Sequence, residues 1–270
     1  MKEAIIIDNL WFKYYEKWVL KNICLKIYRG ETVGLVGPTG SGKTTLAKHI
    51  LGLLKPTRGK VIVEGIDVSK TCASRMAKIV GYVFQNPSHQ IFSETVYDEI
   101  AFGLKNFGVK DIEGRVRDIA EIMGLIDKLD ESPFNLSVGE RERVAIASIL
   151  ALDPSILILD EPTIGQDYKN YMLIKFLLNR LRERGKTIIL ISHDMELVLE
   201  HCDRIIALKD GEILYNGGIE KFFGNNLLLR SLSLEPPPIL NFSKRLGLNI
   251  FIRSIDDLVK VLRNEVRPIC

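Results

Sequence analysis

Short apolar segments alternate with segments of helical period along most of this 270-residue chain. Segments rich in valine and isoleucine predict strands, and segments with apolar residues three and four positions apart predict helices. The predicted strands are 4–8, 23–28, 32–36, 60–64, 79–84, 156–160 and 187–192. The predicted helices are 43–53, 95–104, 112–123, 138–150, 168–184 and 195–201. This alternation is typical of an α/β fold built around a sheet with parallel strands.

The alternation is interrupted before the strand at 156–160, where the chain is helical in period. We therefore expect a helical subdomain at about 86–152, inserted into the sheet domain. Further on, Asp210-Gly211 is a turn signal between two short apolar segments, which predicts a β-hairpin.

The pattern changes again after Gly217-Gly218. Three consecutive prolines at 236–238 break regular structure, and short amphipathic helices are predicted at 242–246 and 255–262. The sequence thus predicts a main domain over 1–218 and a small C-terminal extension over 219–270.

Composition and charge exclude several classes of protein. Hydrophobic residues make up 46% and charged residues 26%, the usual balance of a globular chain, and the net charge of +3 gives no general affinity for nucleic acid. The longest apolar runs are far shorter than the roughly 20 residues that cross a bilayer, and the N-terminus lacks a signal-peptide pattern. The cysteines are scattered without metal-ligand spacing, which favours free thiols in a cytosolic protein. They are Cys24, Cys72, Cys202 and Cys270.

A phosphate-binding loop follows the predicted strand at 32–36 and precedes a predicted helix. It fits the G-x-x-x-x-G-K-[ST] pattern at every position. The glycines let backbone N–H groups turn onto one anion, and the helix N-terminus adds its positive dipole. The lysine would reach the β- and γ-phosphates, and the threonine after it would bind Mg²⁺. The residues are Gly37, Pro38, Thr39, Gly40, Ser41, Gly42, Lys43 and Thr44, with Thr45 next in the chain.

An acid pair, Asp160 and Glu161, ends the apolar strand at 156–160. Carboxylates at the C-terminal end of a buried strand lie where open α/β sheets bind ligands. Asp160 is suited to hold Mg²⁺, directly or through water, and Glu161 to orient or deprotonate the attacking water.

A third motif precedes the acid pair by about 20 residues: Leu136-Ser137-Val138-Gly139-Glu140. Ser137 can cap the helix that begins near Val138, which would give a second helix N-terminus able to bind an anion. With the phosphate loop and acid pair in this order, the chain resembles the ATP-binding-cassette (ABC) ATPases, whose signature motif is normally Leu-Ser-Gly-Gly-Gln. The resemblance covers nearly all of residues 4–218.

The resemblance implies a phosphate-loop ABC ATPase fold with a mixed-sheet core, an inserted helical subdomain and a small C-terminal extension. It implies ATP and Mg²⁺ as cofactors and assigns four further residues. Tyr14 matches the aromatic that stacks on adenine, and the alternative is that it packs on the sheet. Gln85 matches the Q-loop glutamine, which senses Mg²⁺ and couples to a membrane partner. His193 matches the switch histidine at the γ-phosphate, and Asp167 the D-loop aspartate, without the usual Ala-Leu before it.

The segments 85–92 and 95–103 resemble a particular branch, the ATPases of energy-coupling factor (ECF) transporters. Those transporters import vitamins and transition-metal ions, and their ATPases carry a C-terminal extension that helps to hold the dimer together. The resemblance thus implies an ATP-hydrolysing subunit of an ECF-type importer, at the cytoplasmic face of the membrane. An ATPase of another ABC importer is the alternative, and a non-transport ABC ATPase of DNA repair or translation is a more distant one.

The family pairs two ATPase subunits head to tail, so that Ser137 and Gly139 of one subunit would cover the γ-phosphate held by Lys43 of the other. Val138 replaces a glycine and Glu140 a glutamine in the signature, and both changes would weaken the site that this chain completes. We therefore favour a heterodimer with a related ATPase over a homodimer. The resemblance also implies a membrane coupling subunit near the Q-loop and a separate membrane subunit that binds substrate, with no nucleic-acid partner.

Overall fold

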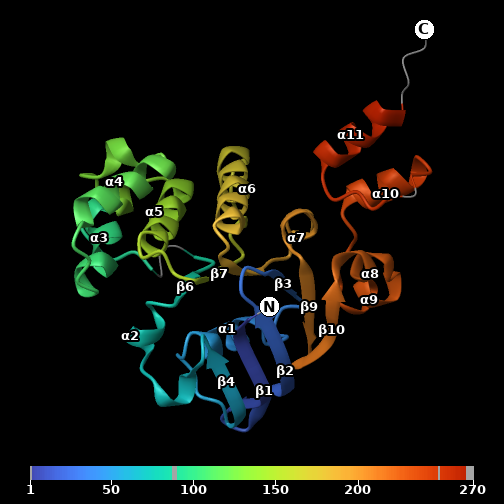
Figure 1. Ribbon diagram of the computed structural model, residues 1–270, viewed down its shortest axis with the longest axis horizontal. Coiled ribbons are helices and arrows are strands. Elements are labelled where there is room, and N and C mark those ends of the chain that lie inside the picture. Colours follow the sequence, from blue (N-terminus) through green and yellow to red (C-terminus); the bar gives the residue numbers. More distant parts are fainter. Residues whose placement is uncertain (1, 87–89, 249, 266–270) are drawn as a thin grey trace.

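The structure is a computed structural model that describes residues 2–86, 90–248 and 250–265 (Figure 1). Pro87, Ser88 and His89, within one of the segments that resemble ECF ATPases, lie outside the described residues, as does Cys270. The other three cysteines are free thiols. No helix in the described part of the chain is long and apolar enough to cross a membrane.

A six-stranded sheet forms the centre of the molecule, in the order β10-β9-β3-β8-β7-β6. Neighbouring strands are parallel except for β10, which closes the predicted hairpin against β9. Strands β3, β6, β7 and β8 are buried at every position, as expected for strands covered on both faces. The bounds are β3 Thr32–Val36, β6 Val80–Val83, β7 Ile156–Asp160, β8 Thr187–Ile191, β9 Arg204–Lys209 and β10 Glu212–Gly218.

A second, antiparallel sheet packs beneath the central one, with α1 between them (Figure 1). The predicted strands 4–8 and 23–28 belong here but are too short, because each strand spans 12 residues. Asn9 is the reason: its φ of 48° marks an irregularity that interrupts the two-residue alternation halfway along β1. The order is β2-β1-β4-β5. The bounds are β1 Glu3–Tyr14, β2 Lys17–Tyr28, β4 Arg58–Val63, β5 Ile66–Asp67 and α1 Lys43–Ile50.

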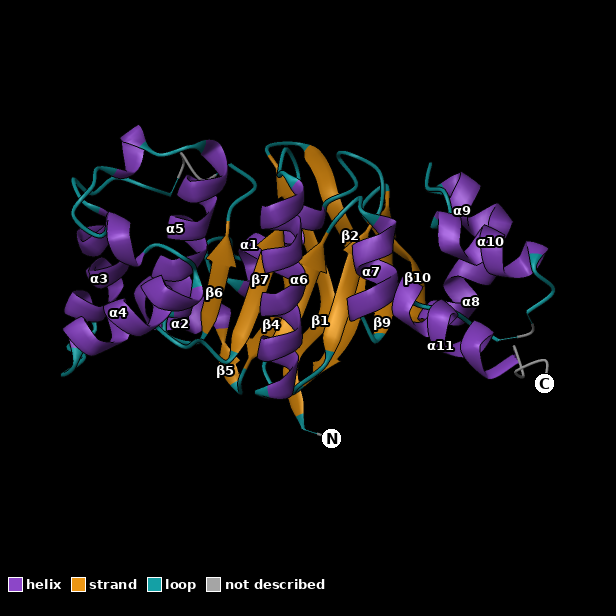
Figure 2. Ribbon diagram, turned by 90° about the horizontal axis from the view of Figure 1, so that it is seen from above, coloured by secondary structure: helices purple, strands orange, loops and turns teal. Residues whose placement is uncertain are grey.

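Helices cover the other face of the central sheet, and α6 and α7 lie across it (Figure 2). Helices α3, α4 and α5 form a block at one side, in the region predicted to be helical. Side chains cap α3 to α7 at their N-termini, through Thr95, Asp111, Ser137, Asp167 and Asp194. The bounds are α3 Val96–Asn106, α4 Ile112–Ile122, α5 Val138–Leu150, α6 Tyr168–Glu183 and α7 Met195–His201.

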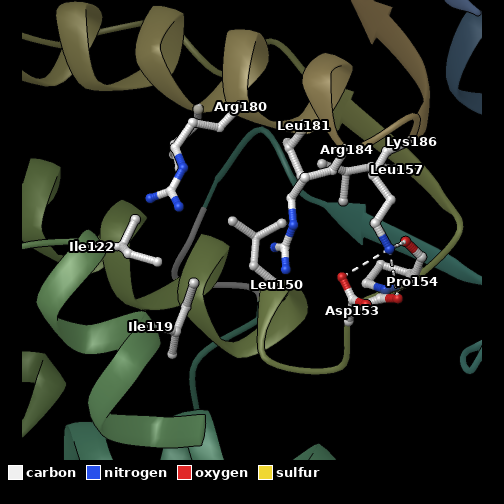
Figure 3. Close-up of a pocket in the computed structure, with 11 residues that line it drawn as sticks. Ile119, Ile122, Leu150, Asp153, Pro154, Leu157, Arg180, Leu181, Arg184 and Lys186 are labelled. Atoms are coloured by element: carbon white, nitrogen blue, oxygen red, sulfur yellow. Dashed lines mark hydrogen bonds and ion pairs between the residues drawn. The ribbon is translucent and has the colours of Figure 1, made fainter. Parts of the chain in front are cut away.

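The seam between the helical block and α6 contains a small cavity of about 40 Å³ (Figure 3). Ile119, Ile122 and Leu150 line it from the block, and the side chains of Arg180 and Arg184 extend over it from the C-terminal part of α6 and the residue just after it. A cavity of this size holds a few water molecules at most. Around it the apolar core is continuous, because buried residues of the block and of α6 belong to one cluster.

Several short helices were not predicted, because one or two turns are too few to show a helical period. They are α2 Ala73–Met76, α8 Ile219–Gly224, α9 Asn226–Ser231 and the 3₁₀ turns Val68–Lys70, Ile126–Lys128 and Pro133–Asn135. The last two helices, α10 Pro238–Arg245 and α11 Ile255–Glu265, lie near the predicted positions and stand apart from the sheets (Figure 1).

Arg253 fastens this C-terminal region to α7. Its Nε donates to the Leu199 carbonyl at 2.9 Å, and Nη2 donates to the carbonyls of Glu200, at 3.4 Å, and Cys202. These carbonyls belong to the C-terminal turn of α7, where a cation is favoured by the helix dipole. Helix α7 begins at Met195, two residues after His193, so Arg253 connects the extension to the helix that follows the predicted switch residue.

Replacing Arg253 by alanine should therefore destabilise the protein by about 2 kcal/mol, because buried carbonyls lose a charged donor. Urea unfolding measures this, with R245A, an exposed arginine of α10, as the matched control. Equal stability of R253A and R245A would contradict the role given to Arg253.

Candidate functional site

A pocket of about 420 Å³ opens at the C-terminal ends of β3, β7 and β8, beside the N-terminus of α1. It brings together most of the predicted site residues with two that were not predicted, Val19 and Ile164. Its lining is Val19, Thr39, Gly40, Gly42, Lys43, Thr44, Thr45, Gln85, Asp160, Glu161, Ile164 and His193.

The phosphate loop depends on its glycines for this shape. Gly37 has a φ of 144°, and a Cβ there would lie 2.0 Å from the carbonyl oxygen of Leu208. The loop closes on itself, because Lys43 Nζ donates to the carbonyls of Gly37, at 2.7 Å, and Pro38, at 3.0 Å. Burial lowers the pKa of Lys43, and the nearby Glu161 and Asp160 act against this effect. An ammonium group and a helix N-terminus thus converge on one place in the pocket, which suits a polyphosphate.

Asp160 is held by two hydroxyl groups at the end of β7. Thr44 Oγ1 donates to Asp160 Oδ2 at 3.2 Å, and Tyr82 Oη donates to the same oxygen at 2.5 Å. Burial, followed by the proximity of Asp160, raises the pKa of Tyr82, so that its hydroxyl remains a donor at neutral pH. Sequence reasoning missed Tyr82, because it is one apolar position among several in its strand and nothing local shows that β6 is next to β7.

The oxygen atoms around Asp160 fit a magnesium ion. Because Thr44 gives its proton to Asp160, the lone pairs of its oxygen remain available to a cation. The carboxylate of Asp160 and the amide oxygen of Gln85 complete a set of hard oxygen donors at the same pocket. The described residues contain no group of three or more His, Cys, Asp or Glu side chains that could hold a metal alone. In a magnesium site one carboxylate and the substrate's phosphates commonly share the ion.

Glu161 lies next to His193 in a strained backbone conformation. Its φ is 54°, in the region that side chains other than glycine rarely adopt, and its N–H donates to the Ile191 carbonyl at 2.8 Å. Its carboxylate accepts from the backbone N–H of His193 at 3.1 Å, and its Oε1 lies 3.5 Å from His193 Nε2. Burial raises the pKa of Glu161. A carboxylate with a raised pKa, facing a pocket, is suited to accept a proton.

Tyr14 is not among the described residues that line the pocket. It stands at the end of β1, 40% exposed, and its ring packs edge to face on Phe12 with the centroids 4.8 Å apart. Val19, on the neighbouring strand β2, lines the pocket. The adenine-stacking role of Tyr14 therefore stays a prediction.

Ser137 and Gly139 also lie outside the pocket lining, at the start of α5. Ser137 and Glu140 form a capping box: Ser137 Oγ and its backbone N–H donate to Glu140 Oε2 at 2.7 and 3.0 Å. Lys128 and Arg143 lie 3.9 and 3.8 Å from Glu140 Oε1, and the hydrogen bonds from Ser137 lower the pKa of Glu140. We expected Glu140 to add negative charge near the polyphosphate. Instead, its carboxylate is engaged by its own helix terminus and by two cations.

The D-loop segment, residues 164–167, contacts α5, the signature helix, which begins within the signature motif. Gln166 Nε2 donates to the carboxylate of Glu142, which is buried in α5, and a Cβ on Gly139 would meet Asn170 at 2.0 Å. Asp167 caps α6 by accepting from the Asn170 N–H at 2.8 Å. Burial raises the pKa of Glu142 to about 7, despite the opposing bond from Gln166. Neither Glu142 nor Gln166 was predicted, because the two are 24 residues apart in the sequence.

The family model for ABC transporters matches residues 20–164 of this chain, from β2 to the end of the pocket-lining segment after Glu161. This chain belongs to the ABC transporter family. A relative from Acetivibrio thermocellus, the energy-coupling factor transporter ATP-binding protein EcfA2, is 46% identical over 252 residues, or 90% of each chain.

Two solved ABC structures are similar to this one. CbiO1 of Clostridium perfringens, part of the ABC transporter complex CbiONQ, has a TM-score of 0.76 at 32% identity, over 90% of this chain and 100% of the other. An ATP-binding cassette solved as a dimer after hydrolysis, with ADP and Pi bound, has a TM-score of 0.72 at 31% identity, over 80% and 98%. The predicted ABC ATPase fold and the resemblance to ECF-type ATPases are therefore confirmed. The chain is an ABC transporter ATPase, which binds and hydrolyses ATP.

The buried carboxylate of Glu142 should make stability depend on pH. Between its ordinary pKa of 4.5 and about 7, the folded ATPase holds a proton that the unfolded chain releases, so stability from this group falls as pH rises through that window. E142Q cannot ionise, and should exceed the wild type by on the order of 3 kcal/mol at pH 8 but by little at pH 5. Urea unfolding at both pH values measures this, with the exposed E183Q as control. An equal gap at both pH values would rule out the ionisation of Glu142 as the cause.

Proposed function

We propose that this chain is the ATP-hydrolysing subunit of an ECF-type importer, which energises uptake of a vitamin or a transition-metal ion through membrane partners. One observation carries the proposal: the pocket gathers Lys43, Asp160, Glu161 and His193, while the signature serine, Ser137, lies outside the residues that line it, at the start of α5. A chain arranged in this way needs a second subunit to enclose the γ-phosphate. The names of the EcfA2 relative and of the CbiO1 neighbour support the ECF type over another ABC importer.

Each pocket residue has a role that its chemistry supports. The backbone of the phosphate loop from Gly37 to Gly42 and the ammonium group of Lys43 bind the phosphates. Thr44, Asp160 and Gln85 hold Mg²⁺, which would neutralise phosphate charge when bound. Tyr14, outside the pocket lining, would stack on the adenine ring.

Glu161 takes a proton from the attacking water, since its carboxylate is buried and has a raised pKa. His193 lines the same pocket and would contact the γ-phosphate. Its backbone N–H holds the carboxylate of Glu161, so that the two residues act as one unit.

The second subunit would sit head to tail, with its signature helix facing this pocket. A helix N-terminus capped by serine supplies N–H groups to developing negative charge. In this chain Val138 lies at that terminus and is 54% exposed. Its side chain would therefore face the nucleotide that this helix covers on the other subunit. This bulk, where the family has glycine, favours a heterodimer with two unequal sites.

The C-terminal extension, 219–270, would add to the dimer contact, beyond the main domain at 1–218. Its helices present apolar side chains to solvent: Phe242 is 51% exposed, Ile255 73% and Leu246 46%. Exposed apolar side chains on neighbouring helices mark an interaction surface.

An apolar groove of about 620 Å³, here called the coupling groove, lies between α2, α3 and the edge strand β6. Two exposed aromatics stand in it, Phe92 and Phe102, whose rings stack edge to face at 4.7 Å. The groove includes Phe84 and lies next to Gln85, so a helix inserted in it would reach the Q-loop. We assign the groove to a helix of the membrane coupling subunit, which would place the ATPase at the cytoplasmic face of the membrane. A separate membrane subunit would bind the substrate.

Replacing Glu161 by glutamine should leave ATP binding intact and slow hydrolysis by about 10²–10⁴-fold, because proton transfer to the carboxylate is lost. K43A should instead weaken binding itself, since it removes a charged phosphate partner. Binding of a fluorescent ATP analogue and release of phosphate measure the two effects, with E183Q as the control. Hydrolysis by E161Q at the wild-type rate would show that Glu161 is not the base.

The heterodimer predicts a further result. Purified E161Q with Mg²⁺ and ATP should remain a monomer by light scattering, and should dimerise when a related ATPase subunit from the same cell is added. A homodimer formed by the wild-type chain alone, with full turnover, would contradict the unequal pairing. Membrane subunits recovered with the complex would then identify the class of transporter.

A further inference from the structure

Tyr82 connects the coupling groove with the nucleotide pocket. Its ring lines the groove and packs edge to face on Phe84, with the ring centroids 4.6 Å apart. Its hydroxyl donates the hydrogen bond of 2.5 Å to Asp160 on the neighbouring strand. One side chain, 6% exposed, therefore has its two ends in two different sites.

The sheet register produces this arrangement. Tyr82 on β6 pairs with Ile158 on β7, and Asp160 is two residues further along, on the same face of the sheet. A diagonal neighbour two residues away lies within reach of a long aromatic side chain. Strand β6 is at the edge of the sheet, with β7 as its partner on one side. The ring of Tyr82 is therefore available to the groove, which adjoins β6.

The contact is strong and rigid. A hydroxyl that donates to a carboxylate makes one of the shorter and stronger hydrogen bonds in proteins. A tyrosine hydroxyl is an ordinary donor at neutral pH. A tyrosine has only two side-chain torsions and is wedged against Phe84, so a shift of the ring moves its hydroxyl as well.

Phe84 itself is partly buried and reaches into the groove beside Tyr82. Movement of Phe84 by a docked helix would thus be passed on to the ring of Tyr82. Gln85 follows Phe84 in the chain and lines the nucleotide pocket directly. It takes no part in the contact from Phe84 through Tyr82 to Asp160.

We propose that Tyr82 is a positioning residue that sets the orientation of Asp160 for Mg²⁺ and transmits changes in the coupling groove to it. The proposal rests on the ATPase function proposed above, since it takes Asp160 as a magnesium ligand and the groove as the docking site. It adds a route between the two that does not pass through Gln85.

The first test compares Mg²⁺ dependence in Y82F, which keeps the ring and removes only the hydroxyl. In equilibrium binding of a fluorescent ATP analogue to the full chain, the Mg²⁺ concentration at half-saturation should rise about tenfold. Affinity for the analogue in EDTA should stay at the wild-type value, because the phosphate loop is untouched. The matched control is Y215F, which loses a hydrogen bond from a tyrosine hydroxyl to the Gly218 carbonyl at 2.7 Å, in another part of the fold. A Y82F protein with the half-saturation of the wild type would overturn the positioning role.

The second test asks for transmission. F84L alters the groove wall against Tyr82, whereas F92L alters an aromatic of the same groove that packs on Phe102 instead. F84L should raise the Mg²⁺ half-saturation in the wild-type background and leave it unchanged in the Y82F background, and F92L should change it in neither. Equal effects of F84L in both backgrounds would mean that the groove does not act through the hydroxyl, and would overturn the proposal.

If Y82F does not fold, F84L in the wild-type background tests the transmission by itself. An unchanged Mg²⁺ half-saturation in F84L would overturn the transmission. Failure of the proposed ATPase function would look different. It would show in the wild-type protein as ATP binding that does not respond to Mg²⁺, and would overturn both proposals. Wild-type binding that depends on Mg²⁺, with Y82F unaffected, would overturn this inference alone.

Discussion

The parallel register of β3, β7 and β8 is the constraint on which the site depends. Because parallel strands end at one edge of a sheet, the residues that follow them are brought together from distant parts of the chain. The phosphate loop follows β3, the acid pair ends β7, and His193 comes two residues after β8. The strands themselves are buried on both faces, so the edge cannot shift without opening the core.

Much of this could be read from the sequence, because each motif adjoins a strand that is apolar throughout. In Ile156–Asp160, four apolar residues predict a buried strand and the aspartate after them marks its end. The position of Asp160 at a sheet edge therefore follows from the local pattern alone. The phosphate loop is equally local, since Gly37 is required by the backbone of the loop itself and by the close carbonyl of Leu208. The helices predicted for the helical block (α3, α4 and α5) and for α6 and α7 follow from their period and from the capping residues directly before them.

What could not be predicted depends on contacts between segments far apart in the chain. Tyr82 reaches Asp160 only because β6 pairs with β7, and the sequence gives no sign of that order. Glu142 in α5 meets Gln166 in the segment before α6, and the motif that contains Gln166 does not show this contact. The full length of β1 was hidden for another reason, because the irregularity at Asn9 breaks the alternation that reveals a strand. The role of Glu140 illustrates the same limit, since charge alone does not show which atoms a carboxylate will meet.

These non-local contacts extend from the pocket in three directions. Tyr82 leads from Asp160 to the coupling groove, and the Glu142–Gln166 bond leads from the segment after Glu161 to the signature helix. The third runs along α7 from His193 to Arg253. Each consists of buried or partly buried polar groups with defined partners, and such contacts favour discrete arrangements over gradual deformation.

The helical block and α6 share one apolar core, with a small cavity of about 40 Å³ between them. A block that is connected to the pocket by specific polar bonds can pass a change at one end of such a bond to the other. This is the mechanical property that an ATPase needs if closure around a nucleotide is to displace a partner bound some distance away. In this chain the bonds made by Tyr82, Gln166 and Arg253 supply that connection.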